Sequence, residues 1–149
     1  MKLSENFSLI EFISSETAMR RGIDNNPTKA EIDNLRALCE NILQPLRDAY
    51  GKPINITSGY RSPKLNKAIG GSKTSHHCFG QAVDFQVPRL DYITVFEILK
   101  KLPFNELIWE FGDAVAPNWI HVSYTRTPKK EILRAYKNKF GQTRYEVYK

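Results

Sequence analysis

Apolar residues recur along the first third of the chain at helical spacing. Ser8–Glu11 and Thr28–Glu31 both have the S/T-x-x-E form of a capping box, so a short helix and then a longer one should begin directly after these N-caps. Pro45 should kink the longer helix or start a new turn in it, and Gly51 and Pro53 should end it. The longer helix is predicted to bury one face, formed by Ile32, Leu35, Cys39, Ile42, Leu43 and Leu46.

Later segments alternate apolar and polar residues, as half-buried strands do. This alternation predicts strands at 54–57, 82–87, 106–111 and 119–124. The last two are joined by GDAVAPN, which suits a hairpin, and 90–102 is predicted to be a helix with Asp91 as its N-cap. The region 58–75 is rich in Gly, Ser and Pro, so we expect a long loop there, of a kind that is usually functional or disordered. Helices followed by strands predict an α+β domain with a mainly antiparallel sheet and N-terminal helices packed on one face.

The composition is that of an ordinary soluble globular domain. A chain of 149 residues can bury a core without disulfides or structural metals. No apolar run approaches the ~18 residues of a membrane span. The opening MKLSENFSLIEF lacks the apolar core of a secretory signal, so we expect synthesis in the cytoplasm. In that reducing compartment Cys39 and Cys78 are expected to stay unbridged.

Charge divides the chain into two parts. The net charge of +6 lies in residues 125–149, where eight lysines and arginines stand against Glu131 and Glu146, and residues 1–124 are neutral. We therefore expect one domain over 1–124 and a basic C-terminal extension over 125–149. The extension could bind an anionic polymer such as a bacterial wall, a membrane surface or nucleic acid, or it could be a solvated terminal helix.

Strand alternation brings potential metal ligands to one face of the sheet. In 82–87 the valines and the phenylalanine share the face expected to be buried, and Asp84 points the other way beside small Ala82. In 119–124 the same alternation leaves His121 on the face away from the core. A histidine from the doublet at 76–77 would complete a set of three nitrogen and oxygen ligands with a fourth position open, the pattern of catalytic zinc. The alternative is that these histidines are ordinary hydrogen-bonded residues.

Short motifs follow one another in a fixed order around these residues. They are SGYRS at 58–62, Asn66, GG at 70–71, S-x-H-x-x-G-x-A-x-D at 75–84 and W-x-H at 119–121. Over about Asn6 to Tyr124 the chain resembles the zinc D-Ala-D-Ala carboxypeptidase family of peptidoglycan metallopeptidases. Its FSLIEF segment and long helix also look like those of the phage and prophage branch. The resemblance implies the α+β fold that this family shares with the hedgehog signalling domain. It also implies one Zn²⁺ ion held by His77, Asp84 and His121.

The resemblance also assigns roles to residues around the metal. Arg61 matches an arginine that binds substrate and stabilises the oxyanion, a task suited to a guanidinium group. Ser75 matches a serine near the peptide groups of the substrate. Many family members have an acidic general base three residues before the last histidine, where this chain has Asn118. Asn118 cannot act as a base, and we expect it to bind substrate. We expect Glu110 to be the base instead, with Asp113 as second choice.

The expected function is zinc-dependent hydrolysis of the peptidoglycan stem peptide, either at D-Ala-D-Ala or at L-Ala-D-Glu. The enzyme would act as a monomer at the bacterial wall, as a phage or prophage lysin released by a holin or carried on a phage particle. An alternative is a metal-containing binding module of the same fold without catalysis, which Asn118 favours. Nucleic-acid binding depends on the basic extension alone and is not expected. His76 and Cys78 fall at variable motif positions, and a Cys/His nucleophile is disfavoured because adjacent residues rarely align for it.

Overall fold

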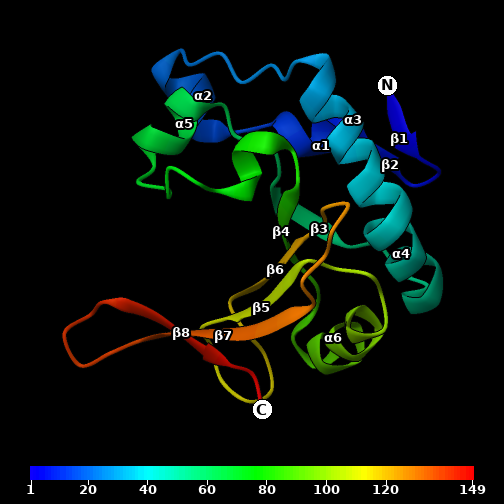
Figure 1. Cartoon of the computed structure of the whole chain (residues 1–149), viewed down its shortest axis with the longest axis vertical. Helices are drawn as coiled ribbons and strands as arrows, with labels where there is room; N and C mark the ends of the chain where they lie inside the picture. The colour runs from blue at the N-terminus through cyan, green and yellow to red at the C-terminus, as the bar shows by residue number, and fades with distance from the viewer.

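A six-stranded sheet forms the centre of the molecule and carries its main helices on one face (Figure 1). The computed structural model describes all 149 residues. Every neighbouring strand pair is antiparallel except β5 and β7, so the prediction of an α+β fold with a mainly antiparallel sheet is confirmed. The order is β3-β4-β6-β5-β7-β8, with β3 Asn55–Ser58, β4 Ala82–Gln86, β5 Glu106–Glu110, β6 Trp119–Ser123, β7 Glu131–Lys137 and β8 Thr143–Val147. A separate two-stranded sheet joins β1 Lys2–Ser4 and β2 Phe7–Ser8.

The predicted N-terminal helices begin where their capping boxes place them. The boxes of Ser8 and Thr28 open α1 (Leu9–Ile13) and α3 (Lys29–Leu38). The longer helix continues from α3 through a π-helical turn, η1 (Cys39–Leu43), into α4 (Gln44–Tyr50), with Pro45 in the first turn of α4. Proline has no N–H and its ring presses on the preceding turn, a conflict that the wider π turn relieves. No helix has the length and apolar character needed to cross a membrane.

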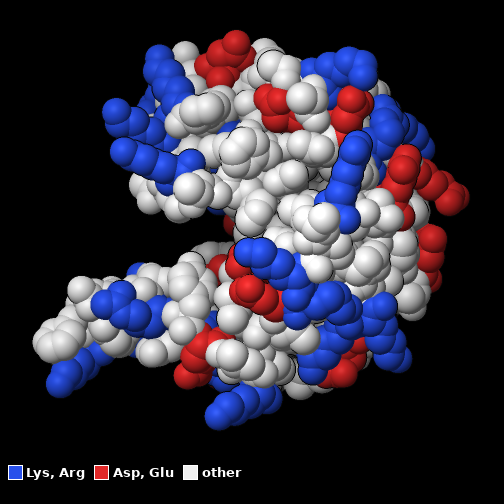
Figure 2. All heavy atoms as spheres, viewed as in Figure 1, with Lys and Arg blue, Asp and Glu red and all other residues white.

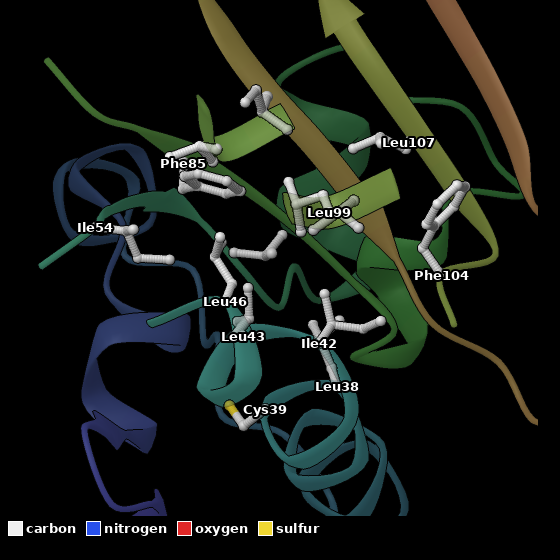
Figure 3. Close-up of a cluster of buried hydrophobic side chains, with 14 of the residues drawn as sticks. Leu38, Cys39, Ile42, Leu43, Leu46, Ile54, Phe85, Leu99, Phe104 and Leu107 are labelled. Carbon is white, nitrogen blue, oxygen red and sulfur yellow. The ribbon is translucent and has the colours of Figure 1, made fainter. Parts of the chain in front are cut away.

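The core lies between this long helix and the sheet (Figure 3). Leu38, Ile42 and Leu46 point from the helix toward the strands and are fully buried, as are Phe85 on β4 and Leu107 on β5. Cys39 joins them as a free, buried thiol, and burial raises its pKa to about 12. The apolar face predicted from the sequence is therefore the face that covers the sheet.

Two predictions about the middle of the chain differ from the structure in detail. The expected loop at 58–75 contains a helix, α5 (Pro63–Ala68), because the hydroxyl group of Ser62 accepts a hydrogen bond from the N–H of Leu65 at 3.2 Å and Pro63 fits the first helical position. Asp91 is the N-cap residue of α6 (Tyr92–Lys100), as predicted, but its side chain makes no capping hydrogen bond. It accepts a hydrogen bond from the hydroxyl group of Tyr50 instead. The remaining short helices are α2 Glu16–Arg21, η2 His76–Phe79 and η3 Arg89–Asp91.

The basic C-terminal segment is part of the sheet. Strands β7 and β8 form an antiparallel hairpin, and β7 lies parallel to β5, so the alternative of a solvated helix was wrong. Beyond β8, the ring of Tyr148 lies 4.8 Å from that of Phe96 on α6 and 5.8 Å from that of Trp109 on β5, measured between centroids. The segment is thus anchored to the core by an aromatic contact.

We predict that Tyr148→Ala lowers the free energy of unfolding by about 2–3 kcal/mol, because it removes two aromatic contacts and leaves a cavity against the core. Urea denaturation monitored by circular dichroism measures the change. Val147→Ala is the matched control, since Val147 is 69% exposed and its loss should matter little. An unchanged stability of Tyr148→Ala would contradict the anchoring of the hairpin by this ring.

Candidate metal centre and active site

Three side chains meet on the face of the sheet opposite the core. His77 comes from η2, Asp84 from β4 and His121 from β6. Asp84 and His121 are direct partners in the antiparallel pairing of β4 with β6. One potential ligand atom from each of the three residues lies within 4.8 Å of the others. The structure thus brings together the three residues that strand alternation and the motif predicted.

The orientation of His77 is fixed by the chain around it. Its Nδ1 lies 2.7 Å from the carbonyl oxygen of Gly59, so Nδ1–H donates to that oxygen and Nε2 faces Asp84. A side chain at position 59 would put a Cβ atom 2.6 Å from the carbonyl oxygen of Phe12, which explains the glycine. The Ser75 hydroxyl group accepts a hydrogen bond from the backbone N–H of His77 at 3.2 Å. Burial lowers the pKa of His77 and so favours the neutral imidazole that binds metals.

Asp84 is hydrogen-bonded to His121 and also lies close to His77. Asp84 Oδ1 lies 2.9 Å from His121 Nδ1 and 3.4 Å from His77 Nε2. Burial alone would raise the pKa of Asp84, but the two histidines lower it well below its usual range, so the carboxyl group is ionised. For His121, burial lowers the pKa, but the hydrogen bond to Asp84 and the nearby carboxylate charges together outweigh burial, so the net pKa is raised.

The donor set fits a zinc ion. Tetrahedral zinc with nitrogen and oxygen ligands at ~2.0–2.1 Å needs donor atoms about 3.3 Å apart. The separations of 2.9 and 3.4 Å between Asp84 Oδ1 and the two histidine nitrogens are close to this value. Two imidazoles and one carboxylate leave a fourth position open, as in catalytic sites. His77, Asp84 and His121 therefore offer a donor set suited to a zinc ion, with all three donor atoms within 4.8 Å of one another.

Glu106 is a residue of this site that the sequence reading missed. Its Oε1 lies 3.8 Å from Nε2 of His121, on the side of the ring away from Asp84. Glu106, Ile108 and Glu110 alternate along β5 and all line the same cavity, so strand alternation could have identified Glu106. A carboxylate beside the second nitrogen of a metal-binding histidine typically orients its ring.

Arg61 is held beside the three candidate ligands. Its Nε donates to the hydroxyl group of Ser58 at 3.2 Å, and one terminal nitrogen donates to Oδ1 of Asn66 at 3.1 Å. The other terminal nitrogen lies 3.5 Å from Oδ2 of Asp84. Gly71 is required here, because a Cβ atom at that position would collide with the Asn66 side chain at 2.0 Å. The GG and SGYRS motifs thus cooperate to fix one guanidinium group.

A cavity of about 430 Å³ connects these groups, and Glu110 lines it. Only 7% of Glu110 is exposed, and burial raises the pKa of its carboxyl group to about 7. Asp113, the second candidate base, is exposed outside this cavity and pairs with Arg89 at 2.8 Å. The geometry therefore favours Glu110 as the acid–base residue.

Asn118 and His76 differ from expectation in whether they line the cavity. Asn118 is exposed and is absent from the cavity lining, and its backbone N–H donates to the carbonyl oxygen of Glu110 at 2.8 Å. A contact between its side chain and substrate stays a prediction. His76 is partly buried and lines the cavity, although its variable motif position implied an exposed residue. Cys78 is a free thiol outside the cavity lining.

The chain matches a known protein family. The sequence profile of the family described as Peptidase M15 matches residues 5–123, which include all three candidate ligands as well as Arg61 and Glu110. No curated protein matches the chain.

We predict that Asp84→Asn lowers the affinity for zinc by more than about 100-fold, because removing even the outer partners of zinc ligands typically costs 10–100-fold. Competition with a chromogenic chelator measures this affinity. His76→Ala is the matched control, since it removes the neighbouring imidazole and should leave zinc binding near that of the unmodified protein. Equal affinities for Asp84→Asn and the unmodified chain would exclude Asp84 from the ligand set.

Proposed function

The chain belongs to the peptidase M15 family, and from this membership we propose that it is a zinc peptidase that hydrolyses the stem peptide of bacterial peptidoglycan. The bond cleaved is either the terminal D-Ala-D-Ala bond or the L-Ala-D-Glu bond. The observation that carries the proposal is the buried carboxyl group of Glu110 in the same cavity as the His77–Asp84–His121 set. A metal-binding protein without catalysis would have no need of a buried, unpaired acid at this place.

Glu110 moves the proton in the proposed reaction. A bound zinc ion supplies Lewis acidity for the scissile carbonyl group and for the attacking water. Glu110 takes a proton from that water and gives it to the leaving amine, which requires a pKa near the working pH. Burial raises the pKa of this carboxyl group to about 7, which suits both halves of the transfer.

Arg61 stabilises the charge that develops on the substrate. Ser58 and Asn66 each accept one of its N–H groups, and one terminal nitrogen lies 3.5 Å from Asp84. That terminal nitrogen carries a second N–H group, which can donate to an oxyanion or a substrate carboxylate. Because the hydrogen bonds to Ser58 and Asn66 already fix the guanidinium group, it loses little conformational freedom when substrate binds. Ser75 lines the cavity, and we expect it to contact peptide groups of the substrate.

A second candidate is a binding module that keeps the metal and has lost catalysis. Asn118 favours it, because many family members have the acidic base at that position. Glu110 reaches the same cavity from the adjacent strand, since its partner in the pairing of β5 with β6 is Trp119, next to Asn118. An acid supplied from β5 can thus replace one supplied from the turn before β6.

The setting in which the enzyme acts follows from its substrate. We expect a monomer that reaches the bacterial wall as a phage or prophage lysin, either released by a holin or carried on a phage particle. Exposed lysines and arginines occur over much of the visible surface (Figure 2). Those of the C-terminal hairpin would favour contact with anionic wall polymers.

We predict that Glu110→Gln lowers kcat for wall hydrolysis by at least about 100-fold, the contribution typical of general acid–base catalysis. The substitution keeps the shape of the side chain and removes its proton transfer. The amount of D-alanine or stem peptide released from purified peptidoglycan in the presence of zinc measures the rate. Asp113→Asn is the matched control and should retain full activity.

Two results would contradict this assignment. Full activity in Glu110→Gln would exclude Glu110 as the base, and inactivity in Asp113→Asn would transfer the role to that residue. A protein that loads zinc fully yet releases nothing from peptidoglycan would favour the binding module.

We also predict that prolonged treatment with EDTA abolishes hydrolysis of peptidoglycan and that added zinc restores it, because no side chain in the cavity supplies the Lewis acidity of a metal ion. Mass spectrometry of the treated peptidoglycan and of the released products then identifies the bond. Loss of one D-alanine indicates a carboxypeptidase, and a free D-glutamyl amine indicates an L-Ala-D-Glu endopeptidase. Activity that survives complete removal of metal would refute the zinc mechanism.

A further inference from the structure

The β7–β8 hairpin forms one wall of the catalytic cavity. The cavity is lined on one side by residues of the segment after α5, among them Ser72 and Ser75, and on the other by Tyr145 of β8. Figure 2 shows a hollow between the part of the molecule that carries α2 and α5 and the arm formed by β7 and β8. The family match ends at residue 123, so this wall comes from outside the matched region.

Strand register places Tyr145 in the same row as Glu110. Glu110 on β5 pairs with Ala135 on β7, and Ala135 pairs with Tyr145 on β8, so all three side chains point to the same face of the sheet. Two strand spacings put the backbones of Glu110 and Tyr145 about 10 Å apart. Ala135 between them is small and fully buried, which leaves the longer side chains free to approach each other over it.

The side chain of Tyr145 is available for a ligand. It is 54% exposed at the edge of the cavity, and its hydroxyl group has no hydrogen-bond partner. Burial and the carboxylates of Glu110, Glu106 and Asp84 raise the pKa of the phenol, so it stays protonated and can donate at neutral pH. The nearby Tyr148, in contrast, lies on the opposite face of the sheet and packs on Phe96 and Trp109 of the core.

We propose that Tyr145 is a substrate-binding residue, and that the β7–β8 hairpin holds the stem peptide against Glu110 from the side opposite Arg61. Arg61 lies beyond the metal ligands at one end of the cavity, and Tyr145 lies beyond Glu110 at the other. A peptide that crosses the cavity therefore meets a guanidinium group on one side of its scissile bond and a phenol on the other. The ring would cover an apolar side chain such as that of alanine, and the hydroxyl group would donate to a peptide carbonyl oxygen.

The inference rests on the proposed peptidase function and adds a binding residue to it. Tyr145 is not a catalytic residue in this scheme, because Glu110 carries the proton transfer. Loss of the phenol should therefore weaken substrate binding and leave the chemical step almost unchanged. A merely structural role would lower the melting temperature and would not raise KM selectively.

The test compares KM and kcat for zinc-loaded protein acting on the synthetic pentapeptide L-Ala-γ-D-Glu-L-Lys-D-Ala-D-Ala, which contains both candidate bonds. We predict that Tyr145→Ala raises KM about tenfold with kcat within about twofold, the loss expected for one hydrogen bond and one ring contact. Tyr145→Phe keeps the ring and should raise KM about threefold. Tyr136→Ala is the matched control, because this tyrosine of the same hairpin alternates with Ala135 and points to the other face. Thermal melting checks that all variants fold.

Binding is measured separately, in a Glu110→Gln background, by calorimetry with the same pentapeptide. A higher Kd in the double variant with Tyr145→Ala supports the inference whether or not the unmodified enzyme cuts this peptide. If the unmodified enzyme cuts the peptide and Tyr145→Ala matches it in KM and Kd, the inference is wrong and the peptidase function stands. If the enzyme neither cuts nor binds the peptide, both are wrong.

Discussion

The register between β4 and β6 is the constraint on which the site depends. Val83, Phe85, Ile120 and Val122 must face the core, and this fixes Asp84 and His121 as direct partners on the other face. A slip of one residue in either strand would exchange its buried and site-facing side chains, which would expose two apolar residues and bury a charged one. The energy of the hydrophobic core thus holds a pair of metal-binding side chains in place. Only His77 depends on a different element, the short helix η2.

Much of the fold and of the metal site could be predicted from the sequence, because helix N-caps and the alternation of apolar and polar residues specify it locally. The capping boxes at Ser8 and Thr28 and the alternation in β4 and β6 act over a few residues, and the structure has the elements they predict. Helix α5 was missed because the surrounding glycines outweighed the helix-starting pair Ser62–Pro63. The contact of Tyr145 with the cavity could not have been predicted, since it requires the parallel pairing of β7 with β5, which no local pattern specifies. Long-range pairing of this kind depends on which strand edge is left free by the rest of the fold.

The site combines groups that would each be costly to bury alone. Asp84 lies among two histidines and Arg61, so its charge is compensated on several sides. Glu110 has no such partner, and its pKa rises instead. The contrast between these two carboxyl groups on neighbouring parts of one sheet separates their roles, with one permanently ionised and the other able to exchange a proton. The environment of each carboxyl group, more than its residue type, determines whether it stays ionised or exchanges a proton.

The parallel strand β7 also determines how the sheet ends. Without it, the outer edge of β5 would present unpaired N–H and C=O groups next to Trp109, an edge on which another chain could assemble. The hairpin moves the open edge to β8, whose residues Arg144 and Glu146 carry charges that discourage such pairing. The same arm therefore protects the molecule from edge-to-edge aggregation, so a shortened protein that lost it would become prone to self-association as well as losing a wall of its cavity.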